Sequence, residues 1–331
     1  MLEEVLVTVR SNPGIDPSLA VWNWEIPLYL FLGGLVAGIL LFASLMVLLG
    51  REKDFPFVSR KLPIWAFVAL SVGMFALFLD LSHKFYVWRF YTTFQVSSPM
   101  SWGAWILVLV YPVIILLSAC TLREGYPALG RLVDRFRAGH AVIEFACKHR
   151  ALVAQWGIVL AVFLGFYTGI LLSALSARPF WNTGFLAPLF LVSGMSAAAA
   201  LVLLGTRSEV ERHTFTRIDI VLIAVKLSLI ALLLVNLATG SRVQIEAAQM
   251  VFAGEFAIPF WVFLVIPGLM IPLILEYWEL KGRRRAWMLV SPVLVLYGSY
   301  MLRQLTVDMG QASSYISYIN AFDPTLLELL R

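Results

Sequence analysis

The sequence predicts an all-α integral membrane protein that crosses the lipid bilayer several times. Of its 331 residues, 60% are hydrophobic and only 14% are charged, whereas soluble domains are about one quarter charged. A water-soluble fold of this length has too little polar surface to cover so many apolar side chains. In lipid, each backbone polar group must be satisfied within its own segment, so the spanning segments must be helices.

Eight apolar stretches of about twenty residues are long enough to cross a hydrocarbon core about 30 Å thick. They are residues 27–49, 62–81, 102–122, 152–175, 185–204, 218–238, 258–277 and 286–305. We expect eight transmembrane helices in two four-helix bundles, with helices 1–4 in residues 26–184 and helices 5–8 in residues 185–305. Residues 1–25 and 306–331 would then be terminal tails outside the membrane.

Lysine and arginine residues are distributed unevenly between alternate loops. The loops after the first, third, fifth and seventh stretches carry four, six, three and four of them, seventeen of the 25 in the chain. The opposite side has Arg10, Lys84, Arg89, Arg178, Arg242, Arg303 and Arg331. Because loops rich in Lys and Arg stay in the cytoplasm, both termini are expected outside. The predicted location is the cytoplasmic membrane of a bacterium, with both termini in the periplasm.

Polar residues gather at the outer ends of the first four stretches. They are Glu25, Tyr29, Asp80, His83, Trp102, Tyr167 and Arg178. One interpretation is an interfacial belt, in which aromatic rings lie among the headgroups and charged groups reach water. Glu25, Asp80 and Tyr167 fit that belt less well, because acids gain little by reaching outward and Tyr167 is expected well inside its helix. A pocket for an apolar ring with two oxygens that exchange protons is the other interpretation.

Three further charged residues, Asp219, Lys226 and Glu276, lie at inner or middle depth. A charge in the apolar core costs roughly 2.5–3.5 kcal/mol, so each needs a reason to be there. Positions 219 and 226 share one face of a helix, about 10 Å apart along its axis. The sequence leaves two interpretations open, a structural ion pair and a relay that carries protons.

We expect no permanently bound redox centre in this chain. Membrane cytochromes hold haem between histidines on facing spans, and the four histidines here fall at a helix end or in loops. Cys120 and Cys147 are too few to ligate an iron–sulfur cluster. The positive charge lies in the loops, where it reports topology and contact with the lipid bilayer rather than nucleic-acid binding.

Three motifs carry a family resemblance. Residues 22–38 read WNWEIPLYLFLGGLVAG, residues 97–105 read SSPMSWGAW, and residues 167–182 read YTGILLSALSARPFWN. In this order they resemble the first span, the entry to the third span and the end of the fourth span of the NrfD/PsrC family. Members of that family are membrane subunits of polysulfide, nitrite and related respiratory complexes.

The resemblance implies a haem-free subunit that reacts with quinone or quinol (menaquinone or ubiquinone) as an exchangeable substrate. It also implies a ferredoxin-like iron–sulfur subunit and a molybdenum or haem catalytic subunit on the outer face. Tyr29 would contact the quinone, at a position that some relatives fill with His, and Tyr167 would match the pocket tyrosine. Asp219 and Lys226 would be candidates for the proton translocation proposed for some members.

The protein would therefore act as the quinone-reactive part of an oxidoreductase complex rather than as an enzyme alone. Two alternatives remain open. A secondary transporter would use Lys226 and Asp219 as its substrate and coupling-ion site. A purely structural anchor would leave all electron transfer to its partners.

Overall fold

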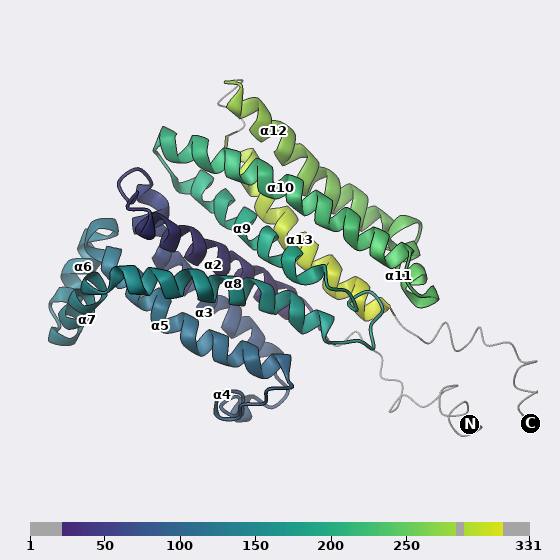
Figure 1. Ribbon diagram of the computed structural model, residues 1–331, viewed down its shortest axis with the longest axis horizontal. Coiled ribbons are helices and arrows are strands. Elements are labelled where there is room, and N and C mark those ends of the chain that lie inside the picture. The colour runs from purple at the N-terminus through teal and green to yellow at the C-terminus, as the bar shows by residue number, and fades with distance from the viewer. Residues whose placement is uncertain (1–21, 283–287, 314–331) are drawn as a thin grey trace, which may run out of the picture.

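The computed structural model describes residues 22–282 and 288–313, and every regular element within these ranges is a helix. The long helices run side by side (Figure 1). Trp22 and Gln311 lie together, since the Gln311 side chain donates to the Trp22 carbonyl at 2.9 Å. We call this the terminal end of the bundle and the other the opposite end. The all-α fold predicted from composition is confirmed for the described residues.

Within the described ranges, seven helices are long and apolar enough to cross a membrane. They are α2 (Glu25–Leu48), η1 with α3 (Phe57–Lys61 and Leu62–Asp80), α5 (Pro99–Gly125), α8 (Arg150–Ser173), α9 (Leu186–Gly205), α10 (Glu209–Ala238) and η3 with α12 (Pro259–Met270 and Ile271–Leu280). They follow the first seven predicted stretches in order. The protein is therefore a multi-pass integral membrane protein.

The eighth predicted span corresponds to α13 (Val290–Ala312). This helix continues past residue 305 into the predicted C-terminal tail, and its second half carries Arg303, Gln304 and Asp308. It is as long as the other spans but less apolar, and it is not one of the seven. Residues 1–21, 283–287 and 314–331 lie outside the described residues. They include parts of both predicted tails and the start of the predicted eighth span. Eight spans, two bundles and external termini stay predictions.

Short helices connect the spans. At the terminal end, η2 (Lys84–Tyr86) and α4 (Arg89–Thr92) lie between α3 and α5, and α11 (Arg242–Phe252) follows α10. At the opposite end, α6 (Pro127–Asp134) and α7 (Arg137–Lys148) form a hairpin between α5 and α8 (Figure 1). The spans thus carry folded connections at both ends of the bundle.

α2 lies at the centre of the bundle, in contact with α3, α8, α9 and α13. Glycines allow the close approach to α9, because a β-carbon at Gly38 would lie 2.5 Å from the Gly194 carbonyl. Such small residues replace the hydrophobic effect as the basis of helix association in lipid. Buried apolar side chains form one cluster mainly from α2, α3, α5 and α8 and another mainly from α10, α11, η3 and α13. Both α2 and α9 contribute to the two clusters.

Arg303 of α13 is fully buried between α2 and α9. Its guanidinium donates to the carbonyls of Leu30 (3.1 Å) and Phe190 (3.0 Å), to Ser193 Oγ (2.8 Å) and to the Ser299 carbonyl (2.8 Å). The sequence analysis counted Arg303 among the cations on the outer side of the membrane. This prediction is wrong, because the side chain of Arg303 lies inside the bundle. A charge can be buried here because oxygens of three helices replace water around it.

We predict that Arg303→Met destabilises the protein in detergent micelles. The substitution keeps an unbranched apolar side chain but removes hydrogen bonds from a charged donor, which contribute about 1.5–3 kcal/mol each. Thermal unfolding followed by circular dichroism should show a lower midpoint. Arg242→Met, at an exposed arginine that pairs with Glu246, is the matched control and should leave the midpoint unchanged. Equal midpoints for both variants would contradict the bridging role of Arg303.

Candidate functional site

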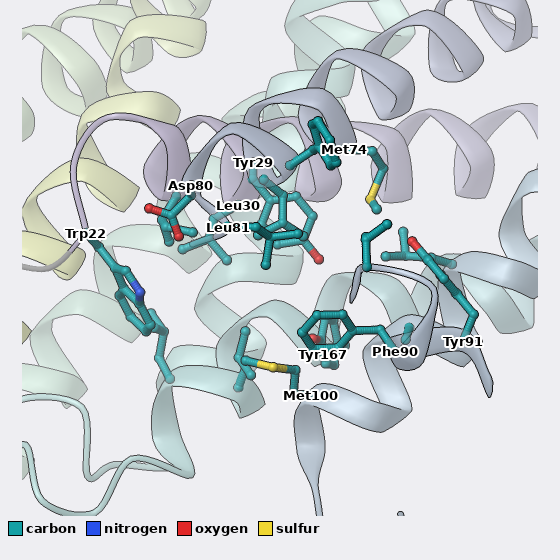
Figure 2. Close-up of a pocket in the computed structure, with 18 residues that line it drawn as sticks. Trp22, Tyr29, Leu30, Met74, Asp80, Leu81, Phe90, Tyr91, Met100 and Tyr167 are labelled. Carbon is teal, nitrogen blue, oxygen red and sulfur yellow. The ribbon is translucent and has the colours of Figure 1, made fainter. Parts of the chain in front are cut away.

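A cavity of about 150 Å³ lies at the terminal end, between α2, α3, α4, α5 and α8. Its wall is mostly apolar, with contributions from Leu30, Met74, Leu77, Phe90, Met100 and Leu107. Four polar side chains enter this wall, Tyr29, Asp80, Tyr91 and Tyr167 (Figure 2). Few polar groups in an otherwise apolar cavity are typical of a small-molecule site.

Two buried phenols define the inner part of the cavity. Tyr29 comes from the first turns of α2 and Tyr167 from the second half of α8, and their hydroxyls lie within hydrogen-bonding reach of each other. Figure 2 shows the two rings facing one another. Gly103 of α5 makes room for this arrangement, because a β-carbon there would overlap the ring carbon and hydroxyl of Tyr167.

Carboxyl groups lie on one side of these phenols. Asp80, the last residue of α3, is half-buried and lines the cavity (Figure 2). Glu25, in the first turn of α2, is close enough to interact with it electrostatically. One carboxyl oxygen of Glu25 is buried and has no hydrogen-bond partner among the described residues. This side of the cavity therefore places acids between the phenols and the terminal end.

Tyr91 lies on the other side of the phenols in Figure 2 and was not predicted as a site residue. It belongs to the short helix α4, which folds back over the cavity. Burial and, to a smaller extent, the Tyr111 phenol raise the pKa of Tyr91 above its ordinary value. Tyr91 is therefore a neutral phenol that can donate a hydrogen bond. No sequence signal indicated this residue, because hydropathy does not show how a loop folds.

The other predicted site residues lie elsewhere. His83 lines an open depression of about 540 Å³, which adjoins the cavity through the shared residues Leu81, Phe90 and Met100. Trp102 is 41% exposed, and its indole N–H donates to the Val96 carbonyl at 2.7 Å. Neither side chain lines the cavity.

Arg178 follows α8 and is buried. Its Nη1 donates to the carbonyls of Gln311 (3.1 Å) and Ser313 (2.6 Å), so it holds the end of α13 rather than lining the cavity. Trp22 stacks on Trp181 at 5.3 Å between ring centroids and lines the cavity. The contacts of Trp22 and Arg178 thus fix the ends of α2 and α13, and these ends support the site.

Asp219, Lys226 and Glu276 meet in a second polar cluster, buried between α10 and α12. Asp219 Oδ1 accepts from Ser196 Oγ at 2.6 Å, and Glu276 Oε1 accepts from Ser291 Oγ at 2.9 Å. The second oxygen of each carboxyl group is buried and has no hydrogen-bond partner among the described residues.

Lys226 Nζ interacts electrostatically with both acids and with Arg303. It has no hydrogen-bond partner among the described residues. The cluster therefore contains a buried lysine together with two buried carboxyl groups. The structure brings together the three residues predicted at inner and middle depth, and it adds Ser196 and Ser291 to them.

The fold and the site define a class of protein. It is a multi-pass helical membrane protein with a phenol-lined cavity near one end of the bundle and a buried charge cluster. The family model described as "Polysulphide reductase, NrfD" matches residues 13–313. The protein belongs to the NrfD family, as the three motifs indicated.

Named relatives align over nearly the whole sequence. The protein is 30% identical to Protein NrfD of Escherichia coli (strain K12) over 307 residues, which cover 88% of this sequence and 95% of that protein. It is 28% identical to the Protein NrfD homolog of Haemophilus influenzae over 315 residues, covering 90% and 97%. It is 27% identical to a polysulfide reductase subunit of Wolinella succinogenes over 304 residues, covering 88% and 94%. That last relative is, by its name, one part of a reductase.

We predict that Gly103→Ala destabilises the protein by about 1–3 kcal/mol, because the added methyl group overlaps Tyr167. In a Tyr167→Ala background the same substitution should cost less than about 0.5 kcal/mol, since the overlapping ring is gone. Unfolding in micelles measures both values. Gly184→Ala is the control, because no atom lies within 4 Å of its β-carbon position. Equal costs of Gly103→Ala in both backgrounds would contradict the contact.

Proposed function

We propose that this protein is the quinone-reactive membrane subunit of a respiratory oxidoreductase in the bacterial cytoplasmic membrane. The observation that carries the proposal is the cavity itself, which combines an apolar wall with three phenols and a half-buried carboxyl group. Membership of the NrfD family and the likeness to the polysulfide reductase subunit support it. The substrate would be menaquinone or ubiquinone, in either redox state.

The cavity suits the head of such a molecule. A quinone ring presents two flat apolar faces and two oxygens at opposite ends, and the phenols from α2, α4 and α8 are donors for those oxygens. A volume of about 150 Å³ is below the 300–1,000 Å³ that drug-sized ligands need. The cavity would therefore hold the ring alone, while the isoprenoid tail extends past the exposed rim of α3 into lipid.

The protein's own residues would manage the protons. Oxidation of a quinol releases two electrons and two protons, and reduction of a quinone takes up the same number. Tyr29 and Tyr167 would fix the position of one oxygen, and Asp80 would exchange its protons with water at the terminal end, with Glu25 beside it. A half-buried carboxyl group can exchange a proton with the bound quinone and with water, because it contacts both the cavity and solvent.

The electrons need a partner. Within the described ranges, no group of three or more His, Cys, Asp or Glu side chains could hold a metal ion. A ferredoxin-like iron–sulfur subunit and a molybdenum or haem catalytic subunit would dock on the outer face. Ser98, Met100 and Ser101 line the open depression that adjoins the cavity, and residues 97–101 would form the docking surface together with the acidic residues Glu246 and Glu255.

We predict that Tyr167→Phe, in the intact complex, lowers the rate of electron exchange with a quinone analogue. Removing one hydrogen bond of about 1.4 kcal/mol should reduce the rate about tenfold, and Tyr29→Phe should act in the same direction. A spectroscopic quinol assay on isolated membranes measures the rate. Tyr277→Phe, at an exposed tyrosine of α12, is the control and should have no effect. Normal turnover in Tyr167→Phe would reject the pocket assignment.

The buried cluster of Asp219, Lys226 and Glu276 supports a second part of the proposal, a proton path to the inner side. If quinol oxidation released protons and electrons on the same face, the reaction would be electroneutral. A path through the cluster would couple the reaction to charge movement. The supporting observation is the burial of two carboxyl groups together with a lysine side chain that has no hydrogen-bond partner among the described residues.

We predict that Lys226→Met in the complex abolishes proton movement across proteoliposomes while quinol-linked electron transfer continues. A pH-sensitive dye inside the vesicles follows the first quantity, and a quinol assay follows the second. Lys281→Met, at an exposed lysine just after α12, is the matched control and should change neither. Proton movement that persists in Lys226→Met would leave the cluster a structural ion pair. Substrate-driven proton movement without any quinone would instead favour a transporter.

A further inference from the structure

The hairpin of α6 and α7 lies outside the candidate spans, at the opposite end of the bundle (Figure 1). It packs on the end of α5, where Ile143 and Ala146 are buried against Ala119 and Leu122. Neither the quinone cavity nor the buried charge cluster includes any of its residues. The hairpin therefore needs an explanation of its own.

A single arginine pairs with both acids of the hairpin. Arg123, near the end of α5, pairs with Asp134 at 2.8 Å and with Glu144 at 2.8 Å. The hydrogen bond from Arg123 holds the pKa of Asp134 below its ordinary value, and His140 also contacts this carboxylate. Both acids are thus paired with Arg123 and engaged in fixing the hairpin to α5.

The cations of the hairpin remain exposed. Arg131, Arg135, Arg137 and Lys148 all lie at the surface. None of the four forms an ion pair with an acidic side chain in the described part of the protein. The solvent-facing side of the hairpin is therefore a cationic surface without internal compensation.

Large apolar side chains are exposed next to these cations. They are Leu129, Leu132, Phe136, Val142 and Phe145, and Phe136 is the most exposed at 65%. At 3.6 residues per turn, Val142 and Phe145 of α7 form a strip between the buried side of Ile143 and Ala146 and the charged side of Arg137. An interfacial helix needs this arrangement. Its apolar strip enters the boundary of the acyl chains, and the cations beside the strip contact the headgroups.

We propose that the α6–α7 hairpin lies in the headgroup region of the inner leaflet and binds anionic phospholipid. Arg131, Arg135 and Arg137 contact the lipid phosphates, and Phe136 and Phe145 enter the acyl boundary. Charge complementarity selects this occupant, because the inner leaflet is anionic and attracts basic segments next to a span. The hairpin follows the membrane span α5 directly and therefore lies next to the lipid headgroups. A protein partner bound to the cations would leave the apolar strip of α7 facing these headgroups.

The test uses the full-length protein in nanodiscs of phosphatidylcholine alone or with phosphatidylglycerol added. Hydrogen–deuterium exchange of residues 127–148 reports the position of the hairpin, and native mass spectrometry reports bound phosphatidylglycerol. The variant Arg131→Gln/Arg135→Gln/Arg137→Gln removes three cations of the hairpin. The control Lys53→Gln/Lys61→Gln/Arg207→Gln removes three exposed cations outside the hairpin at the same end.

We expect phosphatidylglycerol to protect residues 127–148 from exchange. Each cation near the surface contributes about fivefold in lipid affinity, so the hairpin variant should lose on the order of 100-fold and the control much less. Phe136→Ser should reduce the protection in both lipid mixtures. Equal loss in the two triple variants, or the same protection in phosphatidylcholine alone, would overturn the proposal. Protection that requires another subunit instead of lipid would overturn it in favour of a protein-docking surface.

Discussion

Arg303 joins α2, α9 and α13 through hydrogen bonds to Leu30, Phe190 and Ser193. α2 in turn contributes buried residues to both apolar clusters. In lipid a buried guanidinium is tolerated only where oxygens surround it, so the three helices have one relative arrangement that satisfies it. Gly34 contributes by having no side chain, because a β-carbon there would lie 2.5 Å from the guanidinium.

The same contact relates the two polar regions of the molecule. Leu30, whose carbonyl receives the Arg303 hydrogen bond, is the neighbour of Tyr29 in the cavity wall. On its other side, Arg303 is close enough to Lys226 to repel it. The guanidinium therefore stands between the phenols near one face and the carboxyl groups deeper in the bundle.

Hydropathy was sufficient to predict the first seven spans and their order, because long apolar segments have few alternatives in a protein of this composition. The topology deduced from them placed Tyr29, Asp80 and Tyr167 at one depth, and the structure brings these three into one cavity. Arg303 was misplaced because three of its four hydrogen-bond acceptors are backbone carbonyls, and a sequence carries no mark of them. Tyr91 was missed for a related reason, since it reaches the cavity through the fold of a connecting segment.

Arg303 and Leu30 are 273 residues apart in the sequence. During synthesis the first span enters the membrane long before the last one leaves the ribosome. Until then, the oxygens that surround the guanidinium in the finished protein have no cation to bind. The support of the cavity wall next to Leu30 is therefore completed last, when α13 packs against α2. A nascent polypeptide cut short before α13 would contain every phenol of the site and still lack the residue that fixes α2 in place.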